Sequence, residues 1–170
     1  MTDMENVTVR RETDADIPAI EEIITSAFAG VEHSDQSEAD IVRKLRDADA
    51  LSVSLVAVVD GQIVGHVAVS PVTIEDGTGG WFGIGPIAVE PDVQGKGIGS
   101  LLMVWALAAL DRGDAGGVVV LGDPAFYQRF GFVQTELLTY PGPPPEYFRA
   151  RKITDTRFPS GEVRYHPAFG

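Results

Sequence analysis

The chain has 170 residues, of which 44% are hydrophobic and 22% are charged, a composition typical of one globular domain with a sizeable core. It contains no cysteine, which excludes disulfides, thiolate metal sites and a cysteine nucleophile. The formal net charge of −12 argues against nucleic acid or an anionic membrane as a partner, since both need a positive face, whereas a cationic amine would be attracted to acidic residues near a site.

No segment of the sequence is typical of targeting or membrane insertion. Residues 1–12 (MTDMENVTVRRE) lack the apolar core of a signal peptide. No apolar run approaches the length needed to span a bilayer. We therefore expect a cytoplasmic protein.

Two helices are predicted in the first third of the chain, after a short strand at residues 7–9. Thr13 is suited to cap the first helix, with Asp16 three residues later as a variant of the capping box. Its core face consists of apolar residues at helical spacing, namely Ile17, Ile20, Ile24 and Phe28. A second amphipathic helix is expected over residues 37–48.

Three strands are predicted next. Residues 51–59 and 62–74 read as two strands joined by Asp60-Gly61, which is a favoured two-residue hairpin turn. A glycine-containing loop then leads into a third, apolar strand that ends at Val89, just before Pro91.

The stretch from Gly85 to Leu102, GPIAVEPDVQGKGIGSLL, organises the chain. The segment QGKGIG at residues 94–99 precedes a helix expected over residues 100–110. Glycines at three alternate positions let this turn expose several backbone N–H groups at a helix start without obstruction by Cβ atoms. Such a helix N-terminus carries unpaired donors and a partial positive charge, so it suits a phosphate or pyrophosphate.

Familiar nucleotide motifs fit this loop poorly. A Walker loop requires G-x-x-x-x-G-K-[ST], but here Lys96 is followed by Gly97. A dinucleotide fingerprint requires G-x-G-x-x-G, whereas residues 95–99 read G-x-G-x-G. A nucleotide-binding or nucleotide-transfer enzyme is therefore the weakest interpretation, and a serine hydrolase lacks its G-x-S-x-G motif.

The last third of the chain continues the alternation of strands and helices. A fully buried strand is expected at residues 117–121, and Pro124 opens a short helix that Gly131 ends. Extended chain resumes at residues 132–133, and the proline-rich residues 141–145 lead to a short helix expected over residues 146–150. The complete order predicts the α/β class, as a mixed α+β sandwich whose central strands meet at the phosphate loop.

The loop resembles a known cofactor motif. The pattern Gln94-x-x-Gly97-x-Gly99, after an apolar strand and Val-x-Pro, resembles the acyl-CoA pyrophosphate loop of the GNAT N-acetyltransferase superfamily. The runs LGDPAFYQRFGF, PPEYF and YHPAFG are similar to those of its YhbS-type branch. The resemblance covers nearly the whole chain from about Val7 and is strongest over residues 84–148.

A second motif supports the same resemblance. Tyr-x-x-x-Gly-Phe after the fifth strand is widespread in GNAT enzymes, and Tyr127, Gly131 and Phe132 match it. Asp123 stands where members often have an asparagine, so one cofactor contact departs from the pattern. The resemblance implies a central mixed, mostly antiparallel sheet flanked by helices, in a single acyl-CoA N-acyltransferase domain over residues 1–170.

The resemblance also implies a cofactor and the residues that bind it. The cofactor is acetyl-CoA, which leaves as coenzyme A after its acetyl group has moved to an amine. Backbone groups at Ile87, Ala88 and Val89 are expected to bind the pantetheine arm. The pyrophosphate is expected at Gln94, Gly95, Lys96, Gly97, Ile98, Gly99 and Ser100, with further contacts at Asp123 and Tyr127.

Three residues are candidates for catalysis. Tyr127 is the candidate general acid toward the coenzyme thiolate, the alternative being a tyrosine that only packs against the cofactor or the core. Glu90 directly follows the cofactor strand and is the candidate base, unless it is only a solvated carboxylate at a strand end. His66 titrates in the useful range and is a second candidate for catalysis or substrate contact, although a satisfied sheet histidine is the commoner outcome.

Metal chemistry and the identity of the acceptor follow less directly. His33, His66 and His166 lie far apart and no pair has metal-ligand spacing, so no metal is predicted. The acceptor is an amine on a small molecule or a protein, and residues 146–157 are candidates for a substrate pocket or a homodimer contact. The alternative function is a non-catalytic domain that binds and senses acyl-CoA through the same loop.

Overall fold

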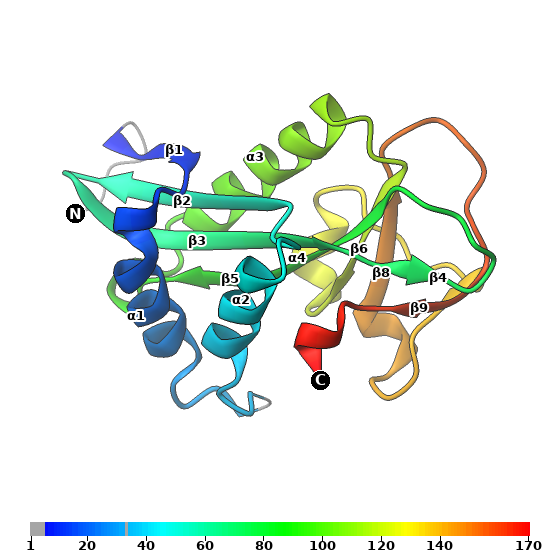
Figure 1. Cartoon of the computed structure of the whole chain (residues 1–170), viewed down its shortest axis with the longest axis horizontal. Helices are drawn as coiled ribbons and strands as arrows, with labels where there is room; N and C mark the ends of the chain where they lie inside the picture. Colours follow the sequence, from blue (N-terminus) through cyan, green and yellow to red (C-terminus); the bar gives the residue numbers. More distant parts are fainter. Residues whose placement is uncertain (1–5, 33) are drawn as a thin grey trace. The chain divides into compact units, whose positions relative to one another are not determined.

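The computed structural model describes residues 6–32 and 34–170, and Figure 1 shows their helices and strands. The helices are α1 (Ile17–Phe28), α2 (Glu38–Asp47), α3 (Ile98–Arg112) and α4 (Pro124–Gln128). The strands are β1 (Thr8–Arg11), β2 (Val53–Val59), β3 (Gln62–Pro71), β4 (Thr73–Ile74), β5 (Trp81–Val89), β6 (Gly117–Leu121), β7 (Leu138–Thr139), β8 (Phe148–Lys152) and β9 (Gly161–Arg164). In the part of the chain that the structure describes, no helix is long and apolar enough to cross a membrane.

Most of the strands belong to one mixed sheet. Its order is β1-β2-β3-β5-β6-β8, and a smaller sheet has the order β4-β9-β7. The pairs β1–β2, β2–β3 and β6–β8 are antiparallel, whereas β5 and β6 run parallel. The expected α/β fold, with a mixed, mostly antiparallel sheet flanked by helices, is confirmed.

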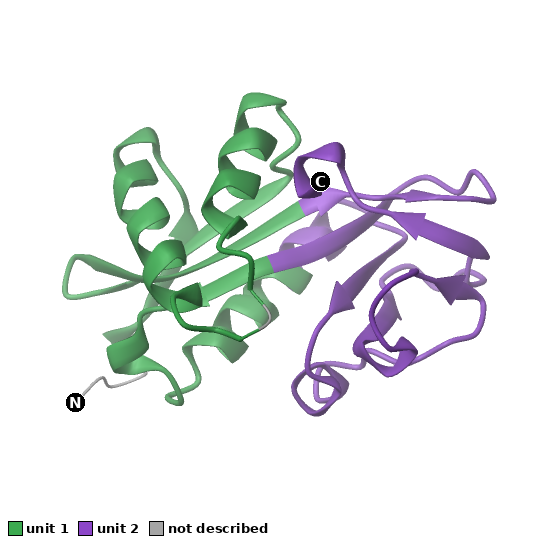
Figure 2. Ribbon diagram, turned by 90° about the horizontal axis from the view of Figure 1, so that it is seen from below, with its two compact units in different colours: residues 1–69, 86–107 green, residues 70–85, 108–170 purple. Residues whose placement is uncertain are grey.

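The chain divides into two compact units, which Figure 2 colours separately. Unit 1 comprises Met1–Val69 and Pro86–Leu107, and unit 2 comprises Ser70–Gly85 and Ala108–Gly170. The core of unit 1 contains Ile20, Ile23, Ile24, Val42, Val56, Ala68 and Ala88, from α1, α2 and three strands. The core of unit 2 contains Val72, Ile74, Trp81, Val119, Leu138, Phe148, Ala150 and Val163. Each unit therefore has apolar packing of its own.

Of two local signals predicted in unit 1, the hairpin turn forms as expected, whereas Thr13 precedes the 3-10 turn Asp14–Asp16 and Asp16 stands at the N-cap of α1. The backbone N–H of Thr13 donates to a carboxylate oxygen of Asp16 at 2.7 Å, just before α1 begins. Asp60 and Gly61 join β2 to β3 with φ values of 50° and 76°, the left-handed conformation that this hairpin turn requires.

A glycine lets α3 lie close to the sheet. A Cβ atom at Gly65 of β3 would lie 3.0 Å from Cδ1 of Leu102 and 3.2 Å from Cγ2 of Ile98. Both contacts are tighter than ordinary van der Waals packing, so a larger residue at Gly65 would require these two side chains of α3 to shift.

Two sequence predictions of secondary structure are wrong. The strand expected over residues 62–74 breaks into β3 and β4, which belong to different sheets. Of the helix expected over residues 146–150, only residues 146 and 147 are helical, in the 3-10 turn Pro145–Tyr147. The rest belongs to β8, which pairs with β6 from Leu121 opposite Phe148 to Gly117 opposite Lys152. Its burial alternates, with Phe148 and Ala150 buried, because an available edge of β6 outweighs the helical preference of a short segment.

Candidate active site

The loop before α3 presents backbone donors to solvent. Gly95 and Gly97 have φ values of 79° and 87°, which only glycine adopts without strain. The N–H of Leu101 donates to the carbonyl of Gly97 at 3.0 Å, so α3 opens at Gly97. Within residues 6–32 and 34–170, the N–H groups of Gly95, Lys96 and Gly97 donate to no other group of the chain.

The start of α3 is anchored while the loop before it is exposed. Residues 94–97 are exposed, whereas the Ile98 side chain is only 1% exposed. The first-turn N–H groups of an α-helix have no intrahelical partner and lie at the positive end of the helix dipole. Together, loop and helix present backbone amides on a fixed support, an arrangement suited to binding an anion.

Gln94 holds the loop to the end of β5. Its side-chain Nε2 donates to the carbonyl of Val89 at 3.0 Å, and its backbone N–H points to the carbonyl of Pro91 at 3.4 Å. The side chain is therefore engaged within the protein, which limits a cofactor contact of Gln94 to its remaining groups.

Among the residues that the structure describes, no strand pairs with one edge of β5 after its first three residues. Pairing with β6 covers only Trp81–Gly83 opposite Gly117–Val119. At the other end, the N–H of Glu90 donates to the carbonyl of Val64 in β3 at 2.8 Å. Because successive residues of a strand point their N–H and C=O groups to opposite edges, Ala88 faces β3, and Ile87 and Val89 face the free edge.

The alternation shifts once along β5. Near its start, the carbonyl of Trp81 accepts a hydrogen bond from Val72 at 3.1 Å, so an odd-numbered residue faces the β3 side there. Near its end an even-numbered residue, Glu90, does so. Gly85, with a φ of 140°, lies between them and precedes Pro86, which has no N–H. This irregularity has the character of a β-bulge and directs Ile87 to the free edge.

Tyr127 lies in α4, which Asp123 caps. The carboxylate of Asp123 accepts a hydrogen bond from the N–H of Ala125 at 3.0 Å, so this side chain is engaged in capping. The Tyr127 ring packs edge-on against Phe132 at a centroid distance of 5.8 Å. Burial, and then the charge of Asp123, raises the pKa of Tyr127 to about 12. The hydroxyl is therefore protonated at neutral pH and able to donate.

Glu90 follows the free edge of β5. Its backbone is fixed by the bond to Val64 and by the N–H of Val93, which donates to the Glu90 carbonyl at 2.9 Å. The side chain is half-buried. Its carboxylate makes no hydrogen bond or ion pair with another described residue, so it is available as a proton acceptor.

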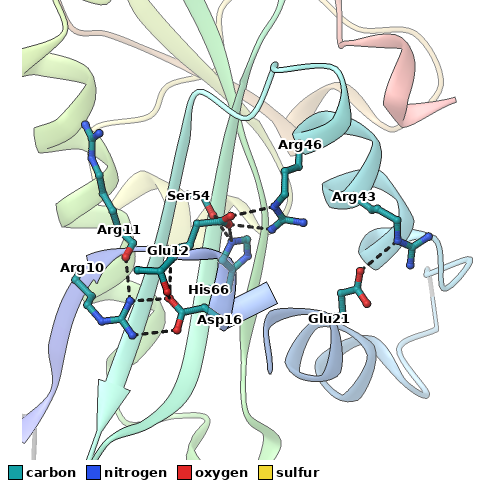
Figure 3. Close-up of polar contacts among 10 residues, drawn as sticks. Arg10, Arg11, Glu12, Asp16, Glu21, Arg43, Arg46, Ser54 and His66 are labelled. Carbon is teal, nitrogen blue, oxygen red and sulfur yellow. Dashed lines mark hydrogen bonds and ion pairs between the residues drawn. The ribbon is translucent and has the colours of Figure 1, made fainter. Parts of the chain in front are cut away.

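His66 belongs to a closed polar network, drawn in Figure 3. Its side chain is 0% exposed, and its Nε2 lies 2.8 Å from Oγ of Ser54. Ser54 also donates to Glu12, which forms a two-pronged ion pair with Arg46 at 2.9 Å for each contact. Burial lowers the pKa of His66 to about 4, against the opposing charge of Glu12. The histidine is therefore neutral at pH 7.

A pocket lies beside this network without reaching His66. It has a volume of about 220 Å³ and is lined by Arg11, Glu12, Arg46, Asp49, Leu51, Ser52, Val53 and Ser54. The sequence analysis did not find Glu12, Arg46 and Ser54. They come from separate elements, with Glu12 34 residues from Arg46 and 42 from Ser54, so no local motif joins them.

The predicted site residues thus fall into three groups. The loop, the end of β5 and Glu90 are contiguous in unit 1, and Asp123 and Tyr127 lie together in unit 2. His66 lies in β3, the strand beside β5, and its side chain belongs to the network of Figure 3. Among the described residues, no group of three or more histidine or acidic side chains could hold a metal ion, and His33 lies outside them.

Comparisons with known proteins point to one family. Residues 50–134 match the family described as "Acetyltransferase (GNAT) domain". The "Uncharacterized N-acetyltransferase YhbS" of Escherichia coli K12 is 37% identical over 125 residues, which are 73% of this chain and 72% of that protein.

Two solved structures are similar over almost the whole chain. A GNAT family acetyltransferase from Brucella melitensis, in complex with acetyl-CoA, has 41% identity and a TM-score of 0.86, covering 96% of this chain and 98% of that one. YhbS from Escherichia coli, in complex with CoA, has 33% identity and a TM-score of 0.88, covering 96% and 92% respectively.

Proposed function

Since this chain belongs to the GNAT acetyltransferase family, we propose that it transfers the acetyl group of acetyl-CoA to a primary amine by direct attack in a ternary complex. The observation that carries the proposal is the loop before α3, whose Gly95–Gly97 amides are unpaired at the start of a 15-residue helix. The Brucella relative holds acetyl-CoA and the Escherichia coli relative holds CoA, which favours the same cofactor here.

The cofactor would bind mainly through backbone groups. We assign the pyrophosphate to the amides of residues 95–100, with Lys96 adding positive charge. The free-edge groups of Ile87 and the N–H of Val89 would bind the pantetheine arm, as a strand adds to a sheet edge, whereas the Val89 carbonyl already accepts a hydrogen bond from Gln94. Ala88 faces β3, so of the three residues predicted in β5 it is the least suited to this contact.

The chemistry requires one proton acceptor and one donor. An amine has an ordinary pKa of about 10, so it must lose a proton before its nitrogen can attack the thioester carbonyl carbon. We assign that proton to Glu90, directly or through water. The tetrahedral intermediate then collapses and the C–S bond breaks. The departing thiolate accepts a hydrogen bond or a proton from Tyr127, and the second proton, which the nitrogen releases as the amide forms, ends on the thiolate directly or by restoring the Tyr127 hydroxyl.

Glu90 is favoured over His66 as the base. Both candidate bases, Glu90 and His66, lie in unit 1. The Nε2 of His66 already contacts Ser54, and the His66 ring is inaccessible to solvent. A substrate could reach His66 only if this network opened. Glu90 needs no such rearrangement, and His66 is instead suited to hold β2 and β3 in register.

The acceptor is an amine on a small molecule or a protein. The net charge of −12 favours a cationic acceptor over an anionic one. Because acetyl-CoA is an intracellular metabolite, the proposal places the reaction in the cytoplasm. A homodimer stays a prediction from the sequence.

Thermal unfolding with and without acetyl-CoA tests the proposal. A ligand at 100 times its dissociation constant stabilises the fold by about 2.7 kcal/mol, a rise in Tm of several degrees. We expect this rise with acetyl-CoA and not with ATP or NAD. A shift with ATP or NAD alone would contradict the cofactor assignment.

Turnover is tested separately, by release of free thiol in the presence of a panel of amines. Release with at least one amine is the expected result. Binding of acetyl-CoA without release for any amine would favour the non-catalytic, acyl-CoA-sensing alternative.

A further inference from the structure

The pocket beside the Glu12 network lies entirely within the segment Met1–Val69 of unit 1. Of the eight residues that line it, six have polar side chains, and only Leu51 and Val53 are apolar. Its volume of about 220 Å³ equals the space of about seven water molecules, at about 30 Å³ each. The pocket is therefore suited to a small polar ligand.

Arg46 supplies unused hydrogen-bond donors to this pocket. Its Nε and Nη2 atoms donate to the two carboxylate oxygens of Glu12, at 2.9 Å each. A guanidinium carries five N–H donors, and those on Nη1 of Arg46 have no acceptor among the described residues. Because Glu12 holds the guanidinium in place, these donors are oriented before a ligand binds.

Arg11 is a second guanidinium at the same pocket, and its charge is not compensated. Its backbone is held in β1 opposite Leu55 of β2, whereas its side chain makes no hydrogen bond or ion pair with another described residue. Figure 3 shows its guanidinium pointing away from the ion pair of Arg10 and Asp16. Arg11 therefore leaves one positive charge available to a ligand.

Asp49 brings the opposite charge to the pocket. It follows α2 with a φ of 55°, a left-handed conformation that aspartate tolerates, and its N–H donates to the carbonyl of Arg46 at 3.1 Å. Within the described part of the chain, its carboxylate makes no hydrogen bond or ion pair. Asp49 therefore leaves one negative charge available to a ligand.

The four charges at the pocket form two pairs of different kinds. Glu12 and Arg46 neutralise each other by direct contact, whereas Arg11 and Asp49 have no partner among the described residues. An anion would be attracted by Arg11 and repelled by Asp49, and a cation would experience the reverse. A small molecule with both a carboxylate and an ammonium group complements both charges.

We propose that this pocket binds a small α-amino acid as its zwitterion. The ligand carboxylate accepts hydrogen bonds from Arg11 and from Nη1 of Arg46, and the ligand ammonium donates to the carboxylate of Asp49. The volume of the pocket favours a short side chain, as in serine. This inference does not depend on the proposed acetyl transfer, because the pocket shares no residue with β5 or with the loop before α3.

L-Serine and two analogues that each lack one of its charges test the pattern on the full chain. Ethanolamine is serine without the carboxylate, and 3-hydroxypropionate is serine without the ammonium. Calorimetric titration at neutral pH should show saturable binding of L-serine, at least about tenfold tighter than of either analogue, because each analogue leaves one charged side chain unsatisfied. Absence of saturable L-serine binding, or equal affinity for 3-hydroxypropionate, would overturn the proposal.

Asp49→Asn removes the negative charge and keeps the shape of the side chain. Asp114→Asn is the matched control, because Asp114 follows α3 with a φ of 59°, donates its N–H to the carbonyl of Asp111 at 3.2 Å and lies outside the pocket. We expect Asp49→Asn to weaken L-serine binding about tenfold and Asp114→Asn to leave it unchanged. Equal affinities in the two variants would mean that L-serine binds elsewhere, and the proposal would be wrong.

Arg11→Gln tests the carboxylate end of the ligand. It should weaken L-serine binding about tenfold, while the Tm without ligand changes little because the side chain makes no bond to lose. An unchanged L-serine affinity in Arg11→Gln would exclude the carboxylate contact and with it the proposed site. Acetyl-CoA binding should be the same in all three variants, so failure of this inference is distinguishable from failure of the proposed function.

Discussion

The partly buried network around Glu12 shows how single residues decide the protonation state of a histidine. Arg46 satisfies both carboxylate oxygens of Glu12, so little of that negative charge is left to stabilise a protonated His66. Although burial raises it, hydrogen bonds from Arg46 and Ser54 hold the pKa of the Glu12 carboxyl below its ordinary value. At neutral pH the Glu12–Arg46 ion pair is therefore charged, whereas His66 is neutral.

This arrangement predicts a loss of stability in mild acid. The folded pKa of His66, about 4, lies below its ordinary value of 6.5, so the unfolded chain binds more protons between these two values. The free energy of unfolding should therefore fall by about 2 kcal/mol from pH 7 to pH 5, above the range where carboxylates titrate. Chemical denaturation at both pH values measures it.

His66→Gln supplies the comparison, because it removes the titrating ring and keeps a polar side chain beside Ser54. Its free energy of unfolding should depend less on pH, whereas His166→Gln, outside the network, should keep the dependence of the parent. An equally steep loss in His66→Gln would assign the acid sensitivity to another group.

Tyr127 gives a second prediction at this scale. The pKa of a thiol is about 8.5, whereas the pKa of the Tyr127 hydroxyl is about 12. The coenzyme thiolate is therefore too weak a base to deprotonate Tyr127 fully, and the Tyr127 hydroxyl mainly donates a hydrogen bond to it. Tyr127→Phe should lower turnover about ten- to a hundredfold and spare acetyl-CoA affinity. Steady-state thiol release measures the first and calorimetry the second. Unchanged turnover would remove Tyr127 from the mechanism.

Among structural elements, the loop before α3 can be tested with a matched control, because Gly95 in this loop resembles Gly61 in the β2–β3 turn. Gly95 and Gly61 have φ values of 79° and 76°, and a Cβ atom at either position would meet nothing within 4 Å. Replacing either by alanine should cost about 1–2 kcal/mol of stability through backbone strain alone. Only Gly95→Ala should also weaken acetyl-CoA binding, by about tenfold, and equal affinities in the two variants would exclude the loop from the cofactor site.

Elements with a strong local signal were predictable from the sequence. The strand expected at residues 117–121 is β6 without change, and the Asp60-Gly61 turn forms the β2–β3 hairpin. The strand at residues 148–150 was mispredicted because its conformation depends on pairing with β6, which lies far away in the sequence. No local pattern encodes such a partner.

For the candidate site, as for the fold, features set by local sequence were predictable and features set by distant contacts were not. The amide loop follows from the spacing of Gly95, Gly97 and Gly99 alone. Two features depend on contacts between distant segments, so only the structure supplies them. They are the polar network of Glu12, Arg46, Ser54 and His66 and the packing of the Tyr165 ring against Gly83. The sequence therefore nominates candidate residues for the chemistry, whereas the partners that hold or neutralise them come only from the structure.

At the scale of the whole molecule, three elements run through both compact units. The division falls after Val69 in β3, after Gly85 in β5 and after Leu107 in α3. A unit that melted alone would have to break each of these elements in the middle. We therefore expect the single domain predicted from the sequence to unfold in one calorimetric transition, with equal calorimetric and van't Hoff enthalpies. Two resolved transitions would show that the units are separate domains.

Because β5 has one paired and one free edge, hydrogen exchange at its free-edge amides can be compared with exchange at the paired amides of the same strand. Amide hydrogens that point toward β3, such as that of Glu90, are shielded by the sheet, whereas those of Ile87 and Val89 have no strand partner. Deuterium uptake along one strand should then alternate between slow and fast sites. A ligand that lies along the edge would slow only the fast ones, so the position of the pantetheine arm can be read at single residues without a crystal of the complex.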